Sequence, residues 1–600
     1  MCGIAGAFAY GRGNGFVEPD ALSRACDAML ARGPDGHGLW CSPDRKVGLA
    51  HRRLSIIDLS ELGAQPMEYP EERLQITFNG EIYNYRELKA SLEASGSRFR
   101  SGSDTEVLLH LYAKYGESMC EHLRGMFAFA IWDDRRQGLF LARDHFGMKP
   151  LYVGRRPGYV FFASQVRAIL ASKAIPVDVE PAGHIGFFIW GNVPQPYTLY
   201  KQIREVPAGH VMWIDEHGIR EPRPFFDLSS EIAALEGQAV EKTREAACER
   251  LAEVTRDTIK HHFVADVPVG VFLSAGRDST SILAVATEVN ESPPISVTLG
   301  FEEYAGTSED EVPLASAVAQ QFGSKHLCQR VQGTDFRTDL ERILKAMDQP
   351  TVDGLNTYFV SKVTSEFGVK VALSGLGADE LLGGYGSFSQ IPRLVNGLKA
   401  AKKTPWLGRA FRSMTAGVMA QVTSPKYAGL LEYGTTYGGA YLLRRGLFMP
   451  WELSRMFDPD MVRMGLQELQ TLTRLDATVK SIKSDRGIVS SLEIQNYMRN
   501  RLLRDSDWAG MAHSLEIRVP FVDVEFFRAI APFFGTDGQL GKADLARVPL
   551  KPLPDSVLNR PKTGFNIPVR EWLMGEKLEA GSERSLRGWA RMVYHELTKA

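Results

Sequence analysis

The 600-residue sequence has few cysteines, almost no net charge and no long apolar run. Its six scattered cysteines fit a reducing cytoplasm better than a disulfide framework, and no Cys/His group has zinc spacing. The net charge of −2 gives no indication of a polyanionic partner. No segment approaches the ~20 apolar residues of a membrane span, and no secretion signal is visible. We therefore expect a cytoplasmic protein without a nucleic-acid or membrane partner.

The length and composition are those of a globular protein with several domains. A chain of 600 residues is too long for one core, and 44% hydrophobic with 24% charged residues is ordinary for a globular protein. There is no internal repeat and no low-complexity tract. A basic group is interpreted as a solvated helix face: Lys399, Lys402, Lys403, Arg409 and Arg412.

The chain begins Met-Cys-Gly-Ile, which places a thiol at the second position. If the initiator methionine is removed, Cys2 carries both a thiol and a free α-amine. The amine has a reference pKa of ~8 and the thiol ~8.5, so either group could hold the shared proton. An N-terminal amine can act as the base for its own side chain, which makes Cys2 a candidate nucleophile.

Three further segments provide what a thiol needs for amide hydrolysis. Asn79 and the N–H of Gly80 follow a strand-like run and could form an oxyanion hole. The segment His51–Ser55 supplies a guanidinium that could clamp a carboxylate. Asp104 opens a helix, where it could be a simple cap or an acceptor for an ammonium group. Together these groups match the needs of glutamine hydrolysis.

These motifs resemble the class II glutamine amidotransferase domain, an N-terminal-nucleophile antiparallel sandwich, which we place at residues 1–212. The resemblance implies that Cys2 is the nucleophile and that Asn79 and Gly80 form the oxyanion hole. It also implies that Arg53, Asn79, Glu81 and Asp104 bind glutamine. The matching segments are 1–4, 32–35, 51–55, 79–84, 103–104 and 143–152. His145 and Gln165 depart from the usual Arg and Glu, away from the proposed chemistry.

The second part of the chain alternates strand-like and helical patterns. We expect a linker at 213–243, which contains Gly, Pro and polar residues, and a second domain at 244–600. The alternation predicts a parallel sheet with helices on both faces, and ligands of such sheets bind beyond the carboxyl ends of the strands.

A small-residue loop, Ser274–Thr280, follows the strand-like run 267–273 and precedes a helical pattern. Strand, loop and helix start point backbone N–H groups at an anion. Asp278 would repel phosphate unless a divalent cation lies between them; alternatively it is a helix cap. The loop resembles the pyrophosphate loop of ATP-pyrophosphatases, with Ala275 in place of a glycine. If this position needs φ > 0, alanine there is strained.

Three later segments carry further candidates. Leu373–Tyr385 is rich in glycine and contains Asp379, which could join Asp278 on Mg²⁺ or serve a helix dipole. Met511–Asp523 is dense in Arg and acid, and a buried ion pair is its expected role. Asn559–Phe565 places Lys562 in a tight loop, where it could stabilise charge in phosphoryl or acyl chemistry.

Taken together, the segments resemble the glutamine-hydrolysing asparagine synthetases, in order and spacing, over nearly the whole chain. The resemblance implies an adenine-nucleotide α-hydrolase-like domain with a helical C-terminal part, aspartate adenylation by ATP, and attack by ammonia delivered through an internal tunnel. It implies that Asp278 and Asp379 bind Mg²⁺ and that Lys562 is catalytic. The ATP-binding residues it implies are Leu273, Ser274, Gly276, Asp278, Ser279, Leu299, Ser374 and Gly375.

Two departures keep alternatives open. Arg277 replaces an aliphatic residue, and Leu376 stands where many asparagine synthetases carry a Glu that can act as base. The alternative to asparagine synthesis is therefore the same amidation of another carboxylate in a natural-product or polysaccharide pathway; a silent scaffold is disfavoured by the retained catalytic residues. A homodimer is compatible with the sequence. Candidates for the acceptor pocket are Asp353, Asn356, Asp505 and Asp507.

Overall fold

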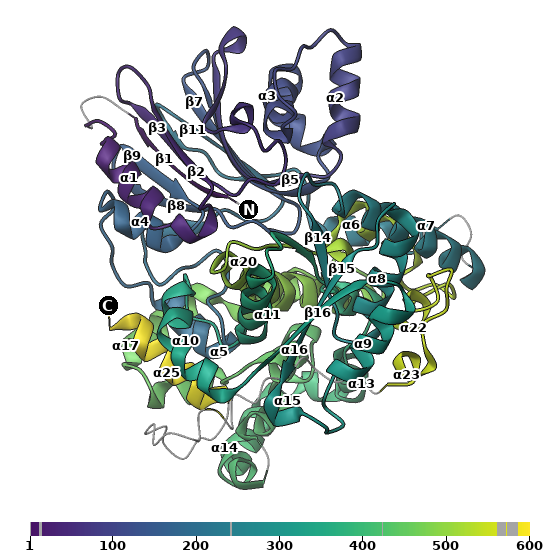
Figure 1. Ribbon diagram of the computed structural model, residues 1–600. Coiled ribbons are helices and arrows are strands. Elements are labelled where there is room, and N and C mark those ends of the chain that lie inside the picture. The colour runs from purple at the N-terminus through teal and green to yellow at the C-terminus, as the bar shows by residue number, and fades with distance from the viewer. Residues whose placement is uncertain are drawn as a thin grey trace.

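The N-terminal third of the protein is a sandwich of two antiparallel sheets (Figure 1). The computed structural model describes residues 2–10, 15–239, 243–422, 424–560, 572 and 586–599. The first sheet has the order β10-β8-β9-β1-β3-β2, with β1 Gly3–Ala9, β2 Gly36–Cys41, β3 Val47–Arg53, β8 Tyr152–Arg156, β9 Tyr159–Ala163 and β10 Ile203–Glu205. The second has the order β12-β11-β7-β6-β5-β4, with β4 Met67–Tyr69, β5 Leu74–Ile82, β6 Gly125–Asp133, β7 Gly138–Arg143, β11 His210–Asp215 and β12 Gly218–Ile219.

The side chains of β6 show that both faces of the second sheet are covered. Successive side chains of a strand point to opposite faces. Phe127 and Phe129 pack into a cluster with Val107 and Leu108 of α3, whereas Ala128 belongs to the cluster between the sheets. Every residue of β6 is therefore buried. The helices of this part are α1 Pro19–Asp27, α2 Tyr85–Ala94, α3 Asp104–Tyr115, α4 Val166–Ser172 and α5 Pro181–Trp190.

The expected domain boundary at residue 212 falls inside a strand. β11 runs to Asp215, and it pairs with both β12 and β13 (Arg223–Pro224). The antiparallel pairing thus continues to Pro224, within the segment that was expected to be linker. The sequence pattern missed these two strands because each has only two residues.

The second part of the chain is built on a parallel sheet, as expected. Its strand order is β16-β15-β14-β17-β18, and all four neighbouring pairs are parallel. Helices α8 and α9 lie on one side of it and α11 and α20 on the other (Figure 1). The strands of this sheet are β14 Val269–Phe272, β15 Ile295–Phe301, β16 Lys325–Val331, β17 Val371–Leu373 and β18 Glu516–Arg518. The helices from α6 to α12 are α6 Leu228–Leu235, α7 Arg244–His262, α8 Arg277–Val289, α9 Val312–Gln321, α10 Gly333–Ala346, α11 Leu355–Glu366 and α12 Ala378–Leu382.

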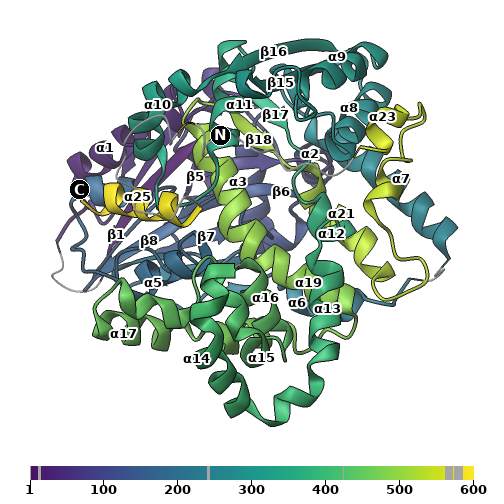
Figure 2. The same ribbon diagram turned by 90° about the horizontal axis from the view of Figure 1, so that it is seen from below.

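The remaining helices form the expected helical part, and α13 to α17 lie together at one edge of the molecule (Figure 2). A π-helical stretch, Glu493–Leu503, joins α19 and α20 into one long helix. The bounds are α13 Ser387–Gly397, α14 Pro405–Val422, α15 Leu430–Tyr433, α16 Tyr437–Arg445, α17 Pro459–Leu469, α18 Thr471–Ala477, α19 Asp485–Leu492, α20 Arg504–Met511, α21 Val524–Ile530, α22 Lys542–Leu545, α23 Asp555–Leu558 and α25 Leu586–Thr598.

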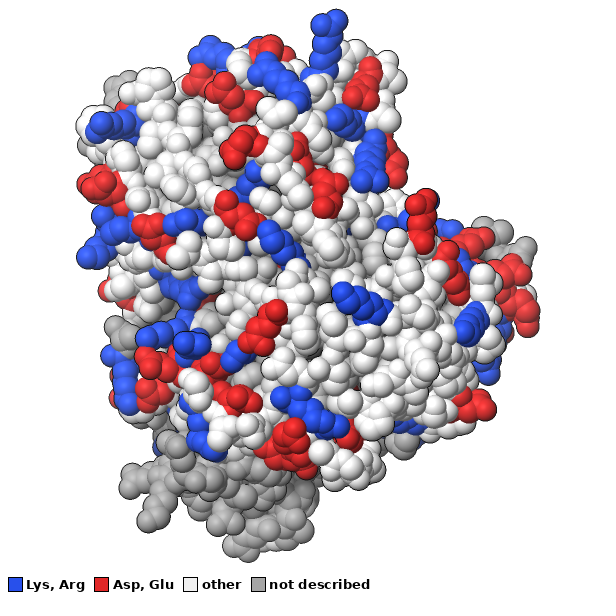
Figure 3. Space-filling model, in the orientation of Figure 1, with Lys and Arg blue, Asp and Glu red and all other residues white. Residues whose placement is uncertain are grey.

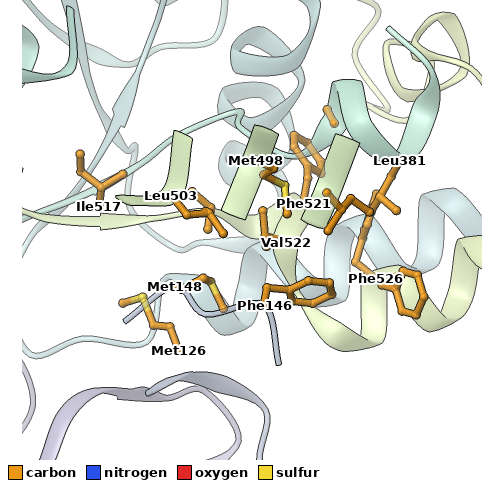
Figure 4. Packing of buried hydrophobic residues seen from close by; sticks show 14 of the residues in the cluster. Met126, Phe146, Met148, Leu381, Met498, Leu503, Ile517, Phe521, Val522 and Phe526 are labelled. Atoms are coloured by element: carbon orange, nitrogen blue, oxygen red, sulfur yellow. The ribbon is translucent and has the colours of Figure 1, made fainter. Parts of the chain in front are cut away.

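The two parts meet across an apolar contact flanked by ion pairs. Met126, Phe146 and Met148 of the sandwich face Leu503 and Val522 of the second part (Figure 4). Arg124 donates to Asp523 at 2.8 Å and to Asp257 at 2.6 Å, so it contacts two elements of the other part. The contact belongs to the largest buried cluster of the described chain, which joins both parts into one core.

The surface carries no large region of one charge sign on the face seen in Figure 3, where basic and acidic side chains alternate. This agrees with the small net charge. Within the described ranges, no helix has the length and apolarity needed to span a membrane.

Candidate active sites

Cys2 lies immediately before β1, where the sandwich meets the second part of the molecule (Figure 1). Its N–H donates to Oδ1 of Asn79 at 3.0 Å, and its Sγ lies 3.9 Å from the carbonyl oxygen of Leu54. Burial raises the pKa of the Cys2 thiol, although a nearby positive charge and the contact with Leu54 oppose the shift. A group that accepts the thiol proton is therefore needed before the sulfur becomes nucleophilic.

Asn79 and Gly80 lie next to the thiol at the end of β5. With Oδ1 occupied by Cys2, the buried Nδ2 of Asn79 has no hydrogen-bond partner among the described residues. Such a donor is costly to bury unless a ligand uses it. Position 80 must be glycine, because a Cβ there would lie 2.1 Å from the carbonyl oxygen of Met126. The predicted oxyanion pair is thus brought to Cys2.

Of the four predicted glutamine-binding residues, Asn79 and Glu81 belong to β5 and Asp104 contacts it. The guanidinium of Arg53 donates to the carbonyl oxygens of Asp58 and Ser60. Asp104 is not the cap of α3, because Ser103 caps it and Asp104 accepts the N–H of Ile82 at 3.0 Å. Burial raises the pKa of Asp104 to about 7.

Glu81 is also buried, and its pKa is raised by burial first and by the nearby carboxylates of Glu516 and Asp104. Two neighbouring carboxyl groups with raised pKa values would gain from an arriving ammonium group, which favours their charged forms. This is the electrostatic property that recognition of an amino acid requires.

One arginine connects this site to the second part of the molecule. Arg518 is fully buried in β18, 2.7 Å from Glu516 and 3.5 Å from Glu81. Its carbonyl oxygen accepts the N–H of Ser374, a residue of the predicted ATP site, at 2.8 Å. The expected buried ion pair of segment 511–523 is confirmed, and its contact with Glu81 was not foreseen.

The small-residue loop has the geometry that its sequence predicts. Ala275 is buried and has a φ of 51°, which is the condition under which alanine is strained at this position. Gly276 precedes the first residue of α8, and the side chains of Ser274 and Ser279 lie 3.2 Å apart across the loop. The loop closes on itself beyond the carboxyl end of β14, where a parallel sheet places its ligands.

All predicted ATP and metal residues line one cavity of about 1000 Å³ at the carboxyl ends of the parallel strands. The small-residue loop Ser274–Thr280 forms one wall, and the Gly-rich segment Leu373–Tyr385, with Ser374 and Gly375, forms another. A Cβ on Gly375 would lie 2.9 Å from the Cβ of Asp278, so glycine permits the close approach of the two loops. The predicted residues on the wall are Leu273, Ser274, Gly276, Asp278, Ser279, Leu299, Ser374, Gly375 and Asp379.

Asp278 and Asp379 converge on one position. The Nζ atom of Lys542 lies 2.5 Å from Oδ2 of Asp278 and 2.7 Å from Oδ1 of Asp379. The two carboxylates are therefore close enough to share one cation, as Mg²⁺ would require. No group of three potential metal ligands occurs in the part of the chain that the structure describes, but Mg²⁺ commonly uses one or two carboxylates plus substrate phosphates.

Leu376 and Glu380 line the side of the cavity where the carboxylate substrate is expected to bind. The hydroxyl of Tyr385 donates to Glu380 at 2.8 Å. Glu380 is 1% exposed, and burial followed by the charge of Asp379 raises its pKa to about 7. A carboxyl group with that pKa is suited to proton transfer near neutral pH.

Of the four acceptor-pocket candidates, three line the cavity and one does not. Asp353, Asn356 and Asp505 lie on its wall. The prediction for Asp507 is wrong, because its two oxygens accept from Arg32 at 2.6 and 2.9 Å in a buried ion pair between the two parts of the molecule. Sequence proximity to Asp505 could not distinguish neighbouring positions of α20.

The predicted catalytic residue Lys562 lies outside the described residues. The segment that precedes it is tied to the ATP loop by two arginines. Arg277 Nε donates to the carbonyl oxygen of Leu558 at 3.1 Å, and Arg560 donates to that of Ser274 at 3.3 Å. The unusual Arg277 thus contacts the chain that leads toward Lys562.

Sequence reasoning missed Lys542 and Tyr385 as site residues. Both line the cavity. Tyr385 is the last residue of the Gly-rich segment Leu373–Tyr385, but Lys542 follows a single glycine and is the first residue of the short helix α22. A lone lysine has no local pattern that indicates a metal site, so only the tertiary structure reveals it.

Comparison with protein families divides the chain into two matches. Residues 1–226 match the glutamine amidotransferase domain, and residues 250–596 match asparagine synthase. The two matches cover the two sites described above, each with its own set of polar residues.

Similar proteins match most or nearly all of the chain. A glutamine-hydrolysing asparagine synthetase of Bacillus subtilis is 33% identical over 610 residues, covering 99% of this chain and 90% of that protein. A putative asparagine synthetase of Mycobacterium tuberculosis is 32% identical, covering 96% and 89%. Asparagine synthetase B of Escherichia coli is 31% identical and covers 65% and 66%. The chain belongs to the glutamine-hydrolysing asparagine synthetase family.

Proposed function

We propose that the protein converts aspartate to asparagine, using glutamine as the nitrogen donor and ATP for activation. The observation that carries the proposal is the cavity in which the predicted ATP residues, the paired Asp278 and Asp379, and the acceptor-side carboxyl Glu380 meet. Family membership supports it, because the relatives named above carry this activity in their names.

The glutaminase step is assigned to the sandwich. The sulfur of Cys2 attacks the side-chain carbonyl of glutamine, and the thiol proton moves to a free α-amine once Met1 is removed. Nδ2 of Asn79 and the N–H of Gly80 hold the oxygen that becomes negative. Glu81 and Asp104 accept hydrogen bonds from the α-ammonium group of glutamine, and Arg53 donates hydrogen bonds to its α-carboxylate. The protonated amine gives the thiol proton to the leaving nitrogen, so the C–N bond breaks, ammonia leaves and a thioester remains. Water then attacks the thioester carbonyl, the C–S bond breaks, and glutamate and the Cys2 thiol are released.

The activation step is assigned to the large cavity. The β-carboxylate of aspartate attacks the α-phosphorus of ATP, and pyrophosphate leaves. The small-residue loop orients the phosphates with its backbone N–H groups. Mg²⁺, held by Asp278 and Asp379, supplies positive charge against the phosphates when bound. Lys562 completes the charge stabilisation in this proposal.

The transfer step needs a base that Leu376 cannot be. Ammonia attacks the acyl carbon, loses a proton, and AMP leaves. We assign the proton to Glu380, whose raised pKa and hydrogen bond from Tyr385 suit the role. The apolar contact of Met126, Met148 and Leu503 lies between the two parts and is where the expected ammonia tunnel would run.

The decisive experiment measures pyrophosphate release from wild-type protein with ATP, Mg²⁺ and ammonium across a panel of carboxylates. Release with aspartate above every other carboxylate supports asparagine synthesis. If aspartate gives no release above background while another carboxylate does, the activation chemistry stands and the acceptor is different. Leu376 is the one observation that favours this second candidate, because an apolar wall suits a less polar acceptor.

We also assign the two activities to two units that are joined between β13 and α7, and we place the protein in the cytoplasm. All six cysteines are free, which supports a reducing compartment. Fractionation of cells with an antibody against the protein tests the location.

A further inference from the structure

A lysine occupies the space between the two aspartates that are proposed to bind Mg²⁺. Lys542 is the first residue of α22, and its ammonium contacts Asp278 at 2.5 Å and Asp379 at 2.7 Å. The two carboxylates come from different helices, α8 and α12, which follow different strands of the sheet. One side chain thus stands where a shared metal ion would stand.

The surrounding backbone is shaped around this contact. A Cβ on Gly384 would lie 1.6 Å from Oδ1 of Asp379 and 2.6 Å from Cδ of Lys542. The start of α22 is fixed because the N–H of Gly541 donates to Asp544 at 2.8 Å. Asp544 in turn pairs with Arg244 of α7 at 2.6 Å. The lysine is therefore anchored by its own helix, while the side-chain amine has four methylene groups with which to move.

The ammonium of Lys542 opposes the entry of free metal, because it already offsets part of the negative charge of the two carboxylates. A divalent cation that arrives alone meets an ammonium at the same position, and like charges at a few ångströms repel strongly in a half-buried site. The side chain of Lys542 is 17% exposed, so water screens this repulsion only in part. Mg²⁺ also sheds its water reluctantly and usually relies on substrate phosphates.

A nucleotide changes this balance. Its phosphate oxygens are strong acceptors for an ammonium group, and they bring negative charge that a metal ion and a lysine can share. Lys542 lines the same cavity as the loop that would hold the phosphates.

We propose that Lys542 is a positioning residue that occupies the cation position of the empty enzyme and releases it to Mg²⁺ only when the phosphates of a nucleotide bind. The inference rests on the proposed function, since it assumes that Asp278 and Asp379 are metal ligands. Metal and nucleotide then enter together, and by linkage each strengthens the binding of the other.

The test is titration of the full-length protein with Mn²⁺, followed by the electron paramagnetic resonance signal of free Mn²⁺, in the absence of nucleotide. Lys542→Met should bind Mn²⁺ about tenfold more tightly than wild type, within the ~5–150-fold range of coupled ligands. Lys542→Arg keeps the positive charge and should bind as weakly as wild type. Lys551→Met is the matched control, because Lys551 lies on the surface with its ammonium on the carbonyl oxygen of Gln321.

The double variant Asp278→Asn/Lys542→Met tests where the ion binds. It should lose the gain in Mn²⁺ affinity that Lys542→Met shows alone. Equal Mn²⁺ affinity of wild type and Lys542→Met would overturn the inference, and so would retention of the gain in the double variant. Wild type alone also tests it: micromolar Mn²⁺ binding without nucleotide would contradict a lysine that excludes the metal.

Failure of the proposed function gives a different result. If wild type with α,β-methylene-ATP holds no Mn²⁺ beyond that bound by the nucleotide, and Asp278→Asn and Asp379→Asn leave the titration unchanged, these aspartates are not ligands. The metal site itself would then be wrong, and the inference with it.

Discussion

The glutamine site and the nucleotide site both contain a pair of acidic side chains, but the positively charged neighbours of the two pairs differ. Glu81 and Asp104 are buried near each other with raised pKa values, and Arg518 lies 3.5 Å from Glu81. Asp278 and Asp379 share the ammonium of Lys542 at 2.5 and 2.7 Å. The first pair is suited to an incoming ammonium group; the second is neutralised in part before a polyanion arrives. The sign of the ligand charge explains the difference.

The largest difference between the two sites is expected when the thiol of Cys2 is removed. Cys2→Ala should abolish glutamine hydrolysis and leave ammonium-dependent asparagine synthesis intact, because the synthetase cavity has its own residues. Glutamate and pyrophosphate release are measured on the same preparation. Cys41→Ala, a half-buried thiol elsewhere, is the control. Equal loss of both activities in Cys2→Ala would show that the two sites are not separate.

The next largest effect is expected in the nucleotide site. Asp278→Asn and Asp379→Asn should each lower pyrophosphate formation by ~10²–10³, the usual loss when one preorganised electrostatic contact is removed. Glutamine hydrolysis should remain. Asp335→Asn is the control, because Asp335 is a half-buried acid in the capping box of α10, outside the residues that line the cavity. Near-normal pyrophosphate release in either variant would mean that the substituted aspartate is a helix cap and not a metal ligand.

The pH dependence of glutamine binding should sharpen the contrast further. The free enzyme holds Asp104 with a pKa of about 7, whereas bound glutamine needs the carboxylate form. The KM for glutamine should be flat above this pKa and rise ~tenfold per pH unit below it, as proton linkage requires. Asp104→Asn should raise KM by ~10–100-fold, the value of a charge-assisted hydrogen bond, and remove the Asp104 transition. A transition that persists in the variant would assign it to another group.

The smallest expected effect concerns the backbone of the ATP loop. Ala275 adopts a φ of 51°, and the left-handed conformation costs ~1–2 kcal/mol for a residue with a Cβ. Ala275→Gly should raise the free energy of unfolding by about 1 kcal/mol or less, since glycine also loses more entropy on folding. Ala284→Gly, inside α8, should instead lower it by about 1 kcal/mol. Denaturant unfolding measures both; a less stable Ala275→Gly would contradict the strain.

Local motifs made much of both sites predictable. A residue such as Asn79 or Ser274 is placed by the strand that precedes it, so its position follows from a short segment. The contacts of Arg518 with Glu81, and of Lys542 with Asp278, join residues separated by hundreds of positions, and no local pattern records them. Asp507 shows the reverse error: a shift of two positions along α20, from Asp505 to Asp507, moves a side chain from the cavity to the other part of the molecule.

The position of Arg518 has a consequence for how such a protein could evolve. Its guanidinium lies 3.5 Å from Glu81 of the glutamine site, while its backbone carbonyl accepts the N–H of Ser374 in the Gly-rich segment Leu373–Tyr385. Fission of the gene into two stand-alone enzymes would leave Glu81 without the arginine that it faces, whereas Arg518 would keep the partners of its own part, Glu516 and the carbonyl oxygens of His262 and Val264. A separate glutaminase would therefore need another group to balance the buried carboxylate of Glu81.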